Sequence, residues 1–141
     1  MDTIELIRVG VRRRVAGSII SPEAYQRQWM DDAPADADVY IRETVMESTR
    51  EAISQQREKV TALVQFDVFV RRGAYPNPMA IASDYADRII KEFNPLYPGN
   101  NTLELDDGSF AYIQNQPYQD TPSQEEEWYY LPVLFNVGVY R

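Results

Sequence analysis

The residues that most often carry out enzymatic chemistry are scarce in this chain. Its 141 residues include neither histidine nor cysteine, so the commonest general base, the usual metal ligands and every histidine-based triad are missing. The only lysines, Lys59 and Lys91, lie in no glycine-rich phosphate loop. Carboxylates, lysines and tyrosines are all that remain for catalysis. We therefore expect a protein that is not an enzyme and that binds no cofactor.

Carboxylate side chains gather in three clusters, which are the remaining candidates for metal binding. The clusters are Asp31, Asp32, Asp36 and Asp38, then Glu104, Asp106 and Asp107, then Glu125, Glu126 and Glu127. Carboxylate oxygens suit a hard cation such as Ca²⁺, but none of the clusters has the ligand spacing, glycine and terminal glutamate of an EF-hand loop. We interpret all three as solvated loop charge and expect no metal site.

Basic residues form two short runs with more than one interpretation. Arg8 and the run Arg12 to Arg14 would make a phosphate or membrane patch, or else a solvated face or a salt-bridging contact between subunits. In an acidic protein the second interpretation is favoured. Arg71 and Arg72 carry the same ambiguity, and we expect them to pair with acidic neighbours across an interface.

Aromatic side chains divide into core candidates and loop candidates. Four of them fall in phase with apolar faces and are expected in the core: Phe66, Phe93, Tyr129 and Phe135. Five others fall in or beside loops: Trp29, Tyr75, Tyr97, Tyr118 and Trp128. Loop tryptophan and tyrosine are the types that anchor protein interfaces, so these five are candidates for either interface contacts or local packing.

The overall composition is that of one folded, acidic domain. Hydrophobic residues make up 44% of the chain, and 14 basic against 22 acidic side chains give a net charge of −8. A chain of this charge repels phosphate backbones, which disfavours a role as a nucleic-acid binder. No apolar stretch approaches the length of a membrane span, and the acidic start of the chain does not resemble a signal peptide. We expect no membrane contact and an intracellular site of action.

Hydrophobic spacing predicts the elements of the first half of the chain. Apolar residues recur at helical intervals from Asp2 to Val15, and a long polar loop follows at about 18–38. Val39 to Met46 and Val60 to Val70 alternate as strands do. The run from Ser48 to Lys59 between them is polar and fits no single element.

The second half of the chain contains clearer signals. Asn77 is a helix cap followed by proline, and the helix it begins runs to Phe93. A hairpin turns at Asp107-Gly108, a polar loop spans 117–127, and a strand with one apolar face closes the chain at 128–140. Pro132 has no amide donor, so this strand is either bulged or has a free edge at that point. The pattern predicts a single α+β domain over residues 1–141.

The order of these elements resembles the tail-terminator and related minor tail proteins of long-tailed bacteriophages. The resemblance is one of layout and size, and it covers nearly the whole chain. It is clearest from Val60 to Phe93 and from Trp128 to Arg141, including the closing segment Pro132 to Val137. No signature motif carries it.

This resemblance implies a twisted, mostly antiparallel sheet of about four to five strands with two main helices packed on it. It also implies a structural virion protein at the junction of tail and neck, assembled in the host cytoplasm. Its copies would form a hexameric ring that caps the tail tube, halts tube polymerisation and docks the head or neck, with DNA only as passing cargo. The candidate contacts in such a ring are Trp29, Arg71, Arg72, Tyr75, Tyr118 and Trp128.

Other functions remain open at this point. A head-tail connector or tail-completion protein has a similar size and also forms rings. A small ferredoxin-like enzyme or ligand-binding domain would use tyrosine and aspartate side chains in a cleft between sheet and helices. A regulatory nucleic-acid binder would use Arg8 and Arg12 to Arg14, against the net charge of the chain.

Overall fold

The protein consists of two helices and one antiparallel sheet in the part of the chain that the structure describes. The structure is a computed structural model, and it describes residues 2–16, 37–96 and 101–141. The sheet has seven strands. The predicted α+β class is therefore confirmed, whereas the expectation of four to five strands is wrong.

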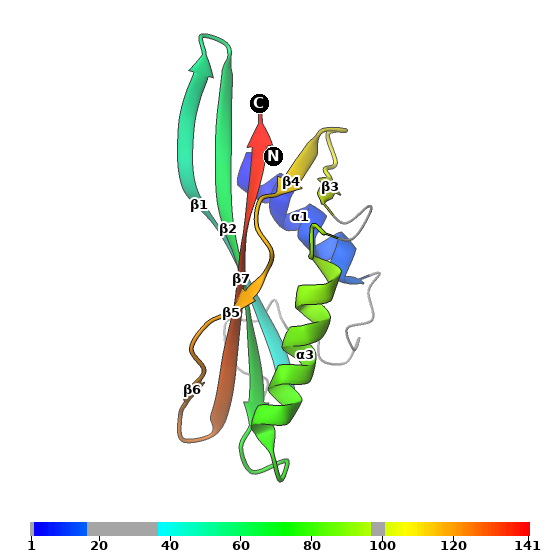
Figure 1. Cartoon of the computed structure of the whole chain (residues 1–141), viewed down its shortest axis with the longest axis vertical. Coiled ribbons are helices and arrows are strands. Elements are labelled where there is room, and N and C mark those ends of the chain that lie inside the picture. The colour runs from blue at the N-terminus through cyan, green and yellow to red at the C-terminus, as the bar shows by residue number, and fades with distance from the viewer. Residues whose placement is uncertain (1, 17–36, 97–100) are drawn as a thin grey trace.

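Five of the strands form the body of the sheet in the order β1-β2-β7-β4-β3 (Figure 1). Their bounds are β1 Val39–Ser54, β2 Arg57–Arg71, β3 Thr102–Glu104, β4 Phe110–Ile113 and β7 Trp128–Tyr140. The two additional strands, β5 (Tyr118–Gln119) and β6 (Ser123–Gln124), also pair with β7. They are too short and too polar to give a hydrophobic pattern, which is why the sequence predicts only a loop there.

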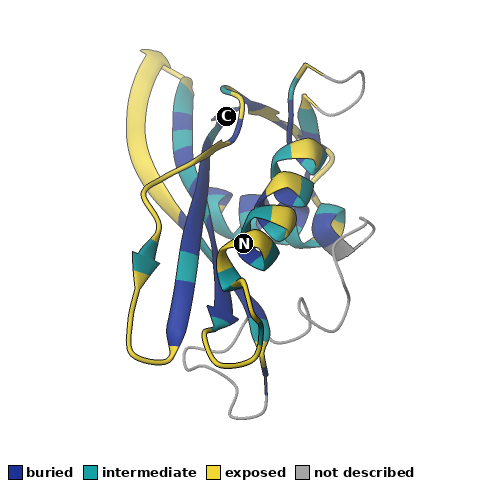
Figure 2. Ribbon diagram, turned by 60° about the horizontal axis from the view of Figure 1, so that its bottom comes forward, coloured by how far each residue is buried: buried dark blue, intermediate teal, exposed yellow. Residues whose placement is uncertain are grey.

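The first two strands form a hairpin that is longer than predicted. The ambiguous run from Ser48 to Lys59 contains the end of β1, the turn and the start of β2. Register shifts between Glu47 and Thr49 and between Ala52 and Ser54 mark irregularities in β1. This half of the hairpin has no apolar alternation because both of its faces meet solvent (Figure 2).

Two helices lie over one face of the sheet. Helix α1 spans Thr3–Ala16 and helix α3 spans Pro78–Glu92. The Asn77 side chain accepts a hydrogen bond from the backbone N–H of Ala80 at 3.3 Å, which satisfies one of the unpaired donors of the first turn of α3. The predicted cap and the proline at the start of the helix are confirmed.

The main core fills the space between the helices and the sheet. Its centre is a group of three fully buried rings, with Phe93 4.8 Å from Phe135 and 5.6 Å from Phe66 between ring centroids. All three were predicted to be core residues. Side chains from α1, including Ile7 and Val11, complete the same core.

Strand β7 is central to the fold, and Pro132 interrupts only one of its edges. The pairing of β7 with β2 runs without a register shift through Asp67 and Pro132, so the strand is not bulged. The carbonyl of Pro132 accepts from the N–H of Asp120, and the N–H and C=O of one strand residue point to the same side. The missing donor therefore faces the gap between β5 and β6, as the free-edge alternative requires.

Candidate functional site

The predicted interface residues gather only partly in the structure. Arg71, Arg72 and Trp128 lie together at one end of the sheet, where Arg71 pairs with Trp128 in register. Tyr75 follows β2 closely and packs against the main core. Tyr118 lies on β5 and is exposed, and Trp29 falls outside the described residues.

The two arginines at this end contact acidic residues of their own chain. The Arg71 guanidinium lies 3.6 Å from a carboxylate oxygen of Asp38 and 3.5 Å from one of Glu127. The backbone N–H of Arg72 donates to the carbonyl of Glu127 at 2.8 Å, and its side chain donates to the carbonyl of Glu125 at 3.1 Å. The structure thus brings arginine and acidic loop together within one subunit, and a role for either arginine between subunits remains a prediction.

Trp128 belongs to a small aromatic cluster on the sheet face opposite the helices. Its ring meets Tyr40 edge to face at 5.1 Å, and Tyr40 stacks on Phe69 at 4.5 Å. The Arg71 guanidinium lies 4.4 Å from the Trp128 ring centroid, a cation–π arrangement. Only 8% of Trp128 is exposed, so local packing accounts for this residue.

The distal half of the first hairpin is the most exposed part of the sheet. We call residues 46–58 the arm. All nine residues from Met46 to Ser54 are exposed, and the arm extends beyond the rest of the molecule in Figure 1. Both Met46, 46% exposed, and Ile53, 52% exposed, present large apolar side chains to solvent.

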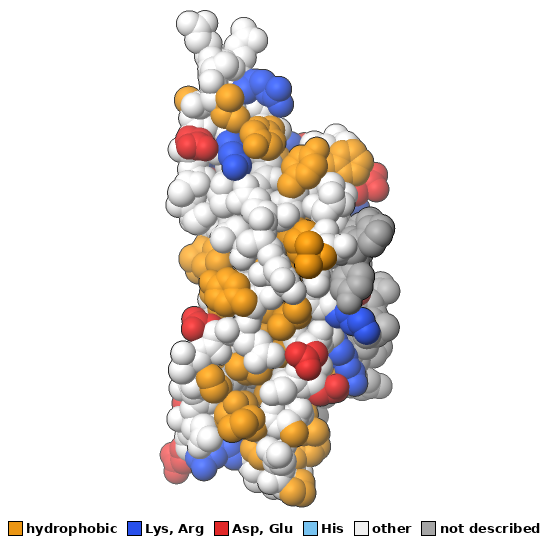
Figure 3. All heavy atoms as spheres, viewed as in Figure 1, with side chains coloured by type: hydrophobic (Ala, Val, Ile, Leu, Met, Phe, Trp, Pro, Cys, Tyr) orange, Lys and Arg blue, Asp and Glu red, His pale blue; other side chains and the backbone are white. Residues whose placement is uncertain are grey.

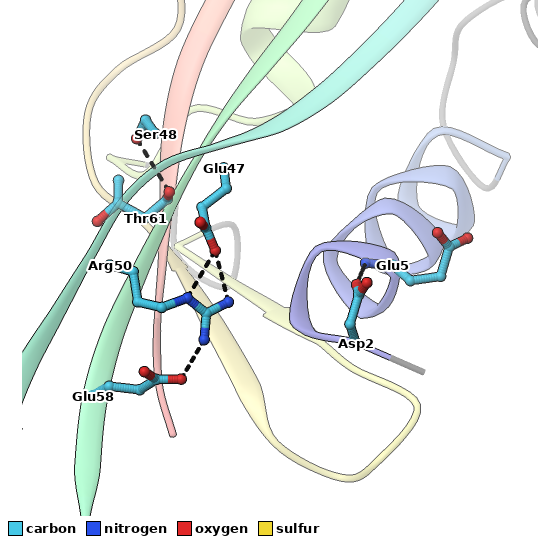
Figure 4. Close-up of polar contacts among 7 residues, drawn as sticks. All are labelled: Asp2, Glu5, Glu47, Ser48, Arg50, Glu58 and Thr61. Atoms are coloured by element: carbon cyan, nitrogen blue, oxygen red, sulfur yellow. Dashed lines mark hydrogen bonds and ion pairs between the residues drawn. The ribbon is translucent and has the colours of Figure 1, made fainter.

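A network of charged side chains holds the arm in shape (Figure 4). The Arg50 guanidinium donates to Oε1 of Glu47 at 2.9 and 2.6 Å, and to Oε1 of Glu58 on the opposite strand. The hydroxyl of Ser48 donates to the carbonyl of Thr61 at 3.1 Å. The pKa of Arg50 is raised, mainly by its hydrogen bond with Glu47. The negative charges of Glu47 and Glu58 raise it further. These contacts link the two strands of the arm, which has no hydrophobic core of its own.

A polar groove lies at the arm tip, beside Arg141, the residue that follows β7. Its volume is about 370 Å³, and its lining residues are Ala52, Ser54, Gln55, Gln56, Arg57, Glu58 and Arg141. Arg141 pairs with Asp107 at 2.6 Å. Among the described residues, neither Arg57 nor the neighbouring Lys59 has an ion-pair partner within 4.0 Å.

A group of exposed aromatic rings at this end of the sheet was not among the predicted interface residues. Phe110, Tyr112 and Tyr140 are each close to half exposed, and Figure 3 shows hydrophobic side chains at the surface near the end of β7. In β4 these rings alternate with the buried Ala111 and Ile113. That alternation was visible in the sequence and would have assigned the rings to the face away from the core.

The arginines of α1 are used within the chain. Arg8 pairs with Glu5, Arg13 pairs with Asp106, and the Arg14 guanidinium donates to the carbonyl of Thr102. Burial lowers the pKa of Arg14, and the negative charge of Glu92 offsets part of this lowering. The contacts of Arg13 and Arg14 join α1 to the β3–β4 hairpin.

The acidic clusters form no metal site in the described part of the chain. The structure contains no group there of three acidic side chains placed to hold an ion. In the second predicted cluster, Asp107 accepts hydrogen bonds from Ser109 and Arg141, which lower its pKa. Of the first cluster, only Asp38 lies within the described residues. No helix in this part of the chain is long and apolar enough to span a membrane.

These features define an α+β domain with an elongated antiparallel sheet, helices on one face and a projecting hairpin. One solved structure with this fold has a TM-score of 0.63 and 18% sequence identity, and the match covers 99% of this chain and 96% of that one. Its title states no function. At this identity the likeness shows the fold alone. No protein-family profile and no curated protein matches the chain.

Proposed function

We propose that this chain is a structural assembly protein of the tail-terminator type. Its copies form a hexameric ring that caps the tail tube of a long-tailed bacteriophage, stops tube polymerisation and joins the tail to the head or neck. The observation that carries the proposal is the arm, whose edge strand is exposed on both faces from Met46 to Ser54. The layout of the sequence supports the more specific assignment to a tail terminator.

An ordered but uncovered arm is suited to binding another protein subunit. Fixing the backbone of a residue costs about 1–2 kcal/mol, and a two-stranded ribbon without a core is marginally stable in water. Packing the exposed Met46 and Ile53 against a partner would bury apolar area and offset that cost. The charged side chains and register shifts of β1 discourage its exposed edge from pairing with strands of unrelated chains. A specific partner subunit is therefore favoured.

The net charge of −8 is compatible with this function. DNA passes through a tail as cargo and must not adhere to the wall of the channel, and an acidic subunit repels it. The partners are other copies of the chain, the tail-tube protein and the neck proteins. No catalytic step is involved.

The mass of the purified protein in solution tests the proposal. Native mass spectrometry and light scattering, at several concentrations and with or without added tail tubes, should give a hexamer. A dodecamer would favour a head-tail connector instead. A stable monomer or dimer that ignores tail tubes would overturn the assembly function and favour a small ligand-binding domain.

Shortening the arm tests the observation on which the proposal rests. In one variant, residues 52–58 are replaced by Asn-Gly, a dipeptide that closes two-residue hairpins between Glu51 and Lys59. We expect this variant to fold and to lose the oligomer. The control keeps the arm and carries Met79→Ala, which removes a similarly exposed apolar side chain from α3, and it should assemble normally. Assembly of the shortened variant at wild-type strength would contradict a role for the arm.

A further inference from the structure

The two ends of the sheet carry charges of opposite sign, and some of these have no ion-pair partner among the described residues. At the arm tip, Arg57 lines the polar groove. Lys59 follows two residues later on β2, with its ammonium group 5.7 Å from the centroid of the Tyr140 ring. Neither cation has an ion-pair partner among the described residues. At the other end, the turn between β6 and β7 presents Glu125, Glu126 and Glu127, all exposed. In the same part of the chain, neither Glu125 nor Glu126 has an ion-pair partner.

The acidic turn is held firmly by its backbone. The N–H of Glu125 donates to the carbonyl of Trp128 at 2.8 Å, and the N–H of Arg72 donates to the carbonyl of Glu127 at 2.8 Å. The side chain of Arg72 binds the carbonyl of Glu125 at 3.1 Å. Because these bonds use carbonyls, the carboxylates of Glu125 and Glu126 stay available to an external cation.

These two features cannot meet within one molecule. Lys59 pairs with Tyr140 at one end of the β2–β7 ladder, and Arg71 pairs with Trp128 at the other. A strand of this length separates the ends by roughly 40 Å, at about 3.3 Å per residue. A contact between these charges can therefore form only between two molecules.

We infer that the acidic turn of one copy docks beside the polar groove at the arm tip of the next copy, where its carboxylates meet Arg57 and Lys59. The docked molecule is a second copy of this chain, because the acidic turn of the chain itself carries the negative charge that complements Arg57 and Lys59. The inference rests on the proposed assembly function and specifies the contact. A contact between different patches is heterologous, and its repetition closes into a ring when the rotation between subunits permits.

Reciprocal charge reversal tests this contact. The groove variant carries Arg57→Glu and Lys59→Glu, and the turn variant carries Glu125→Lys and Glu126→Lys. In either variant alone, like charges face each other at every contact, and we expect association at least about tenfold weaker than that of the wild type. An equimolar mixture restores opposite charges at each contact and should recover the ring, with the two variants present in equal numbers by native mass spectrometry.

A control and three outcomes make the test decisive. The control Asp87→Lys with Glu104→Lys changes the net charge as much as the turn variant does, at exposed sites that belong neither to the groove lining nor to the acidic turn, and it should assemble normally. Assembly of the groove and turn variants at wild-type strength, or a mixture that fails to recover, would overturn this contact and leave the proposed function standing. Failure of the wild type itself to assemble, with or without tail tubes, would overturn the assembly function and this contact with it.

Discussion

Glu43 is a carboxylic acid set against the main core. It lies in β1 between Ile41 and Val45, both of which belong to the main core. Both carboxylate oxygens are buried without a hydrogen-bond partner. Burial raises the pKa of Glu43 to about 8, against the opposing charges of Arg12 and Arg8 on α1. A carboxyl group in this position holds its proton at neutral pH.

The stability of the protein should therefore fall as the pH rises from about 4.5 to about 8. In that range the unfolded chain releases the Glu43 proton while the folded chain retains it, so the stabilisation present below pH 4.5 is lost as the pH approaches 8. Urea unfolding at several pH values measures this slope. In Glu43→Gln we expect the slope to flatten and the stability at the alkaline end to rise by on the order of 2 kcal/mol. The exposed Glu51→Gln on the same strand is the control, and an unchanged slope in Glu43→Gln would contradict the assignment.

Sequence patterns could not predict which interface candidates would be buried. The positions of Arg71 and Trp128 at the end of β2 and the start of β7 follow from the strand pattern alone. Their contact does not, because it depends on the antiparallel register that places Arg71 opposite Trp128. The same register places Glu43 opposite the buried Phe66 and buries its carboxylate oxygens, although glutamate favours the surface.

Among the elements, helix α3 has the clearest origin in local sequence. Asn77 caps it, Pro78 begins it, and Ala82, Ala86 and Ile89 form its buried face. The cap hydrogen bond is exposed and makes no tertiary contact, so its removal should affect little beyond the helix.

We expect Asn77→Ala to lower the free energy of unfolding by about 1 kcal/mol, because a first-turn donor loses its acceptor. Thermal unfolding followed by circular dichroism measures the change. Asn77→Ser retains an oxygen acceptor and should stay close to the wild type. Equal losses in the two variants would show that the side-chain hydrogen bond is not the cause.

The elements predicted correctly are those whose hydrophobic residues recur with a clear period and whose ends are marked by a local stop signal such as glycine or proline. Both helices, the closing strand β7 and the hairpin with Gly108 at a φ of 85° belong to this group. The arm, β5 and β6 do not, because exposed strands have no apolar face and exist through pairing with β2 and β7. The candidate contact between copies depends on these same segments, so sequence periodicity gave no indication of it.

At the scale of the whole molecule, charge is distributed unevenly although the total is strongly negative. The acidic turn and the cations Arg57 and Lys59 mark opposite ends of the β2–β7 ladder. A contact between them depends on short-range attraction between exposed charges, which salt screens.

Association of the wild-type protein should accordingly weaken as the salt concentration rises above physiological strength. The net negative charges of two copies repel each other over distances longer than the Debye length, which is about 8 Å at 0.15 M salt. This repulsion is therefore already screened at physiological salt. Further salt then mainly reduces the attraction at the contact. Sedimentation at increasing sodium chloride concentration measures this dependence. Stronger association at high salt would indicate apolar docking through Phe110, Tyr112 and Tyr140 instead.

The burial of Trp128 among Tyr40 and Phe69 also provides an intrinsic optical probe. The chain has two tryptophans, and changing Trp29 to phenylalanine would leave the Trp128 indole as the single one. Its emission is sensitive to the polarity around the ring, and the ring lies next to the acidic turn in the chain. Fluorescence of that variant would follow events at this end of the sheet in real time, without an attached dye.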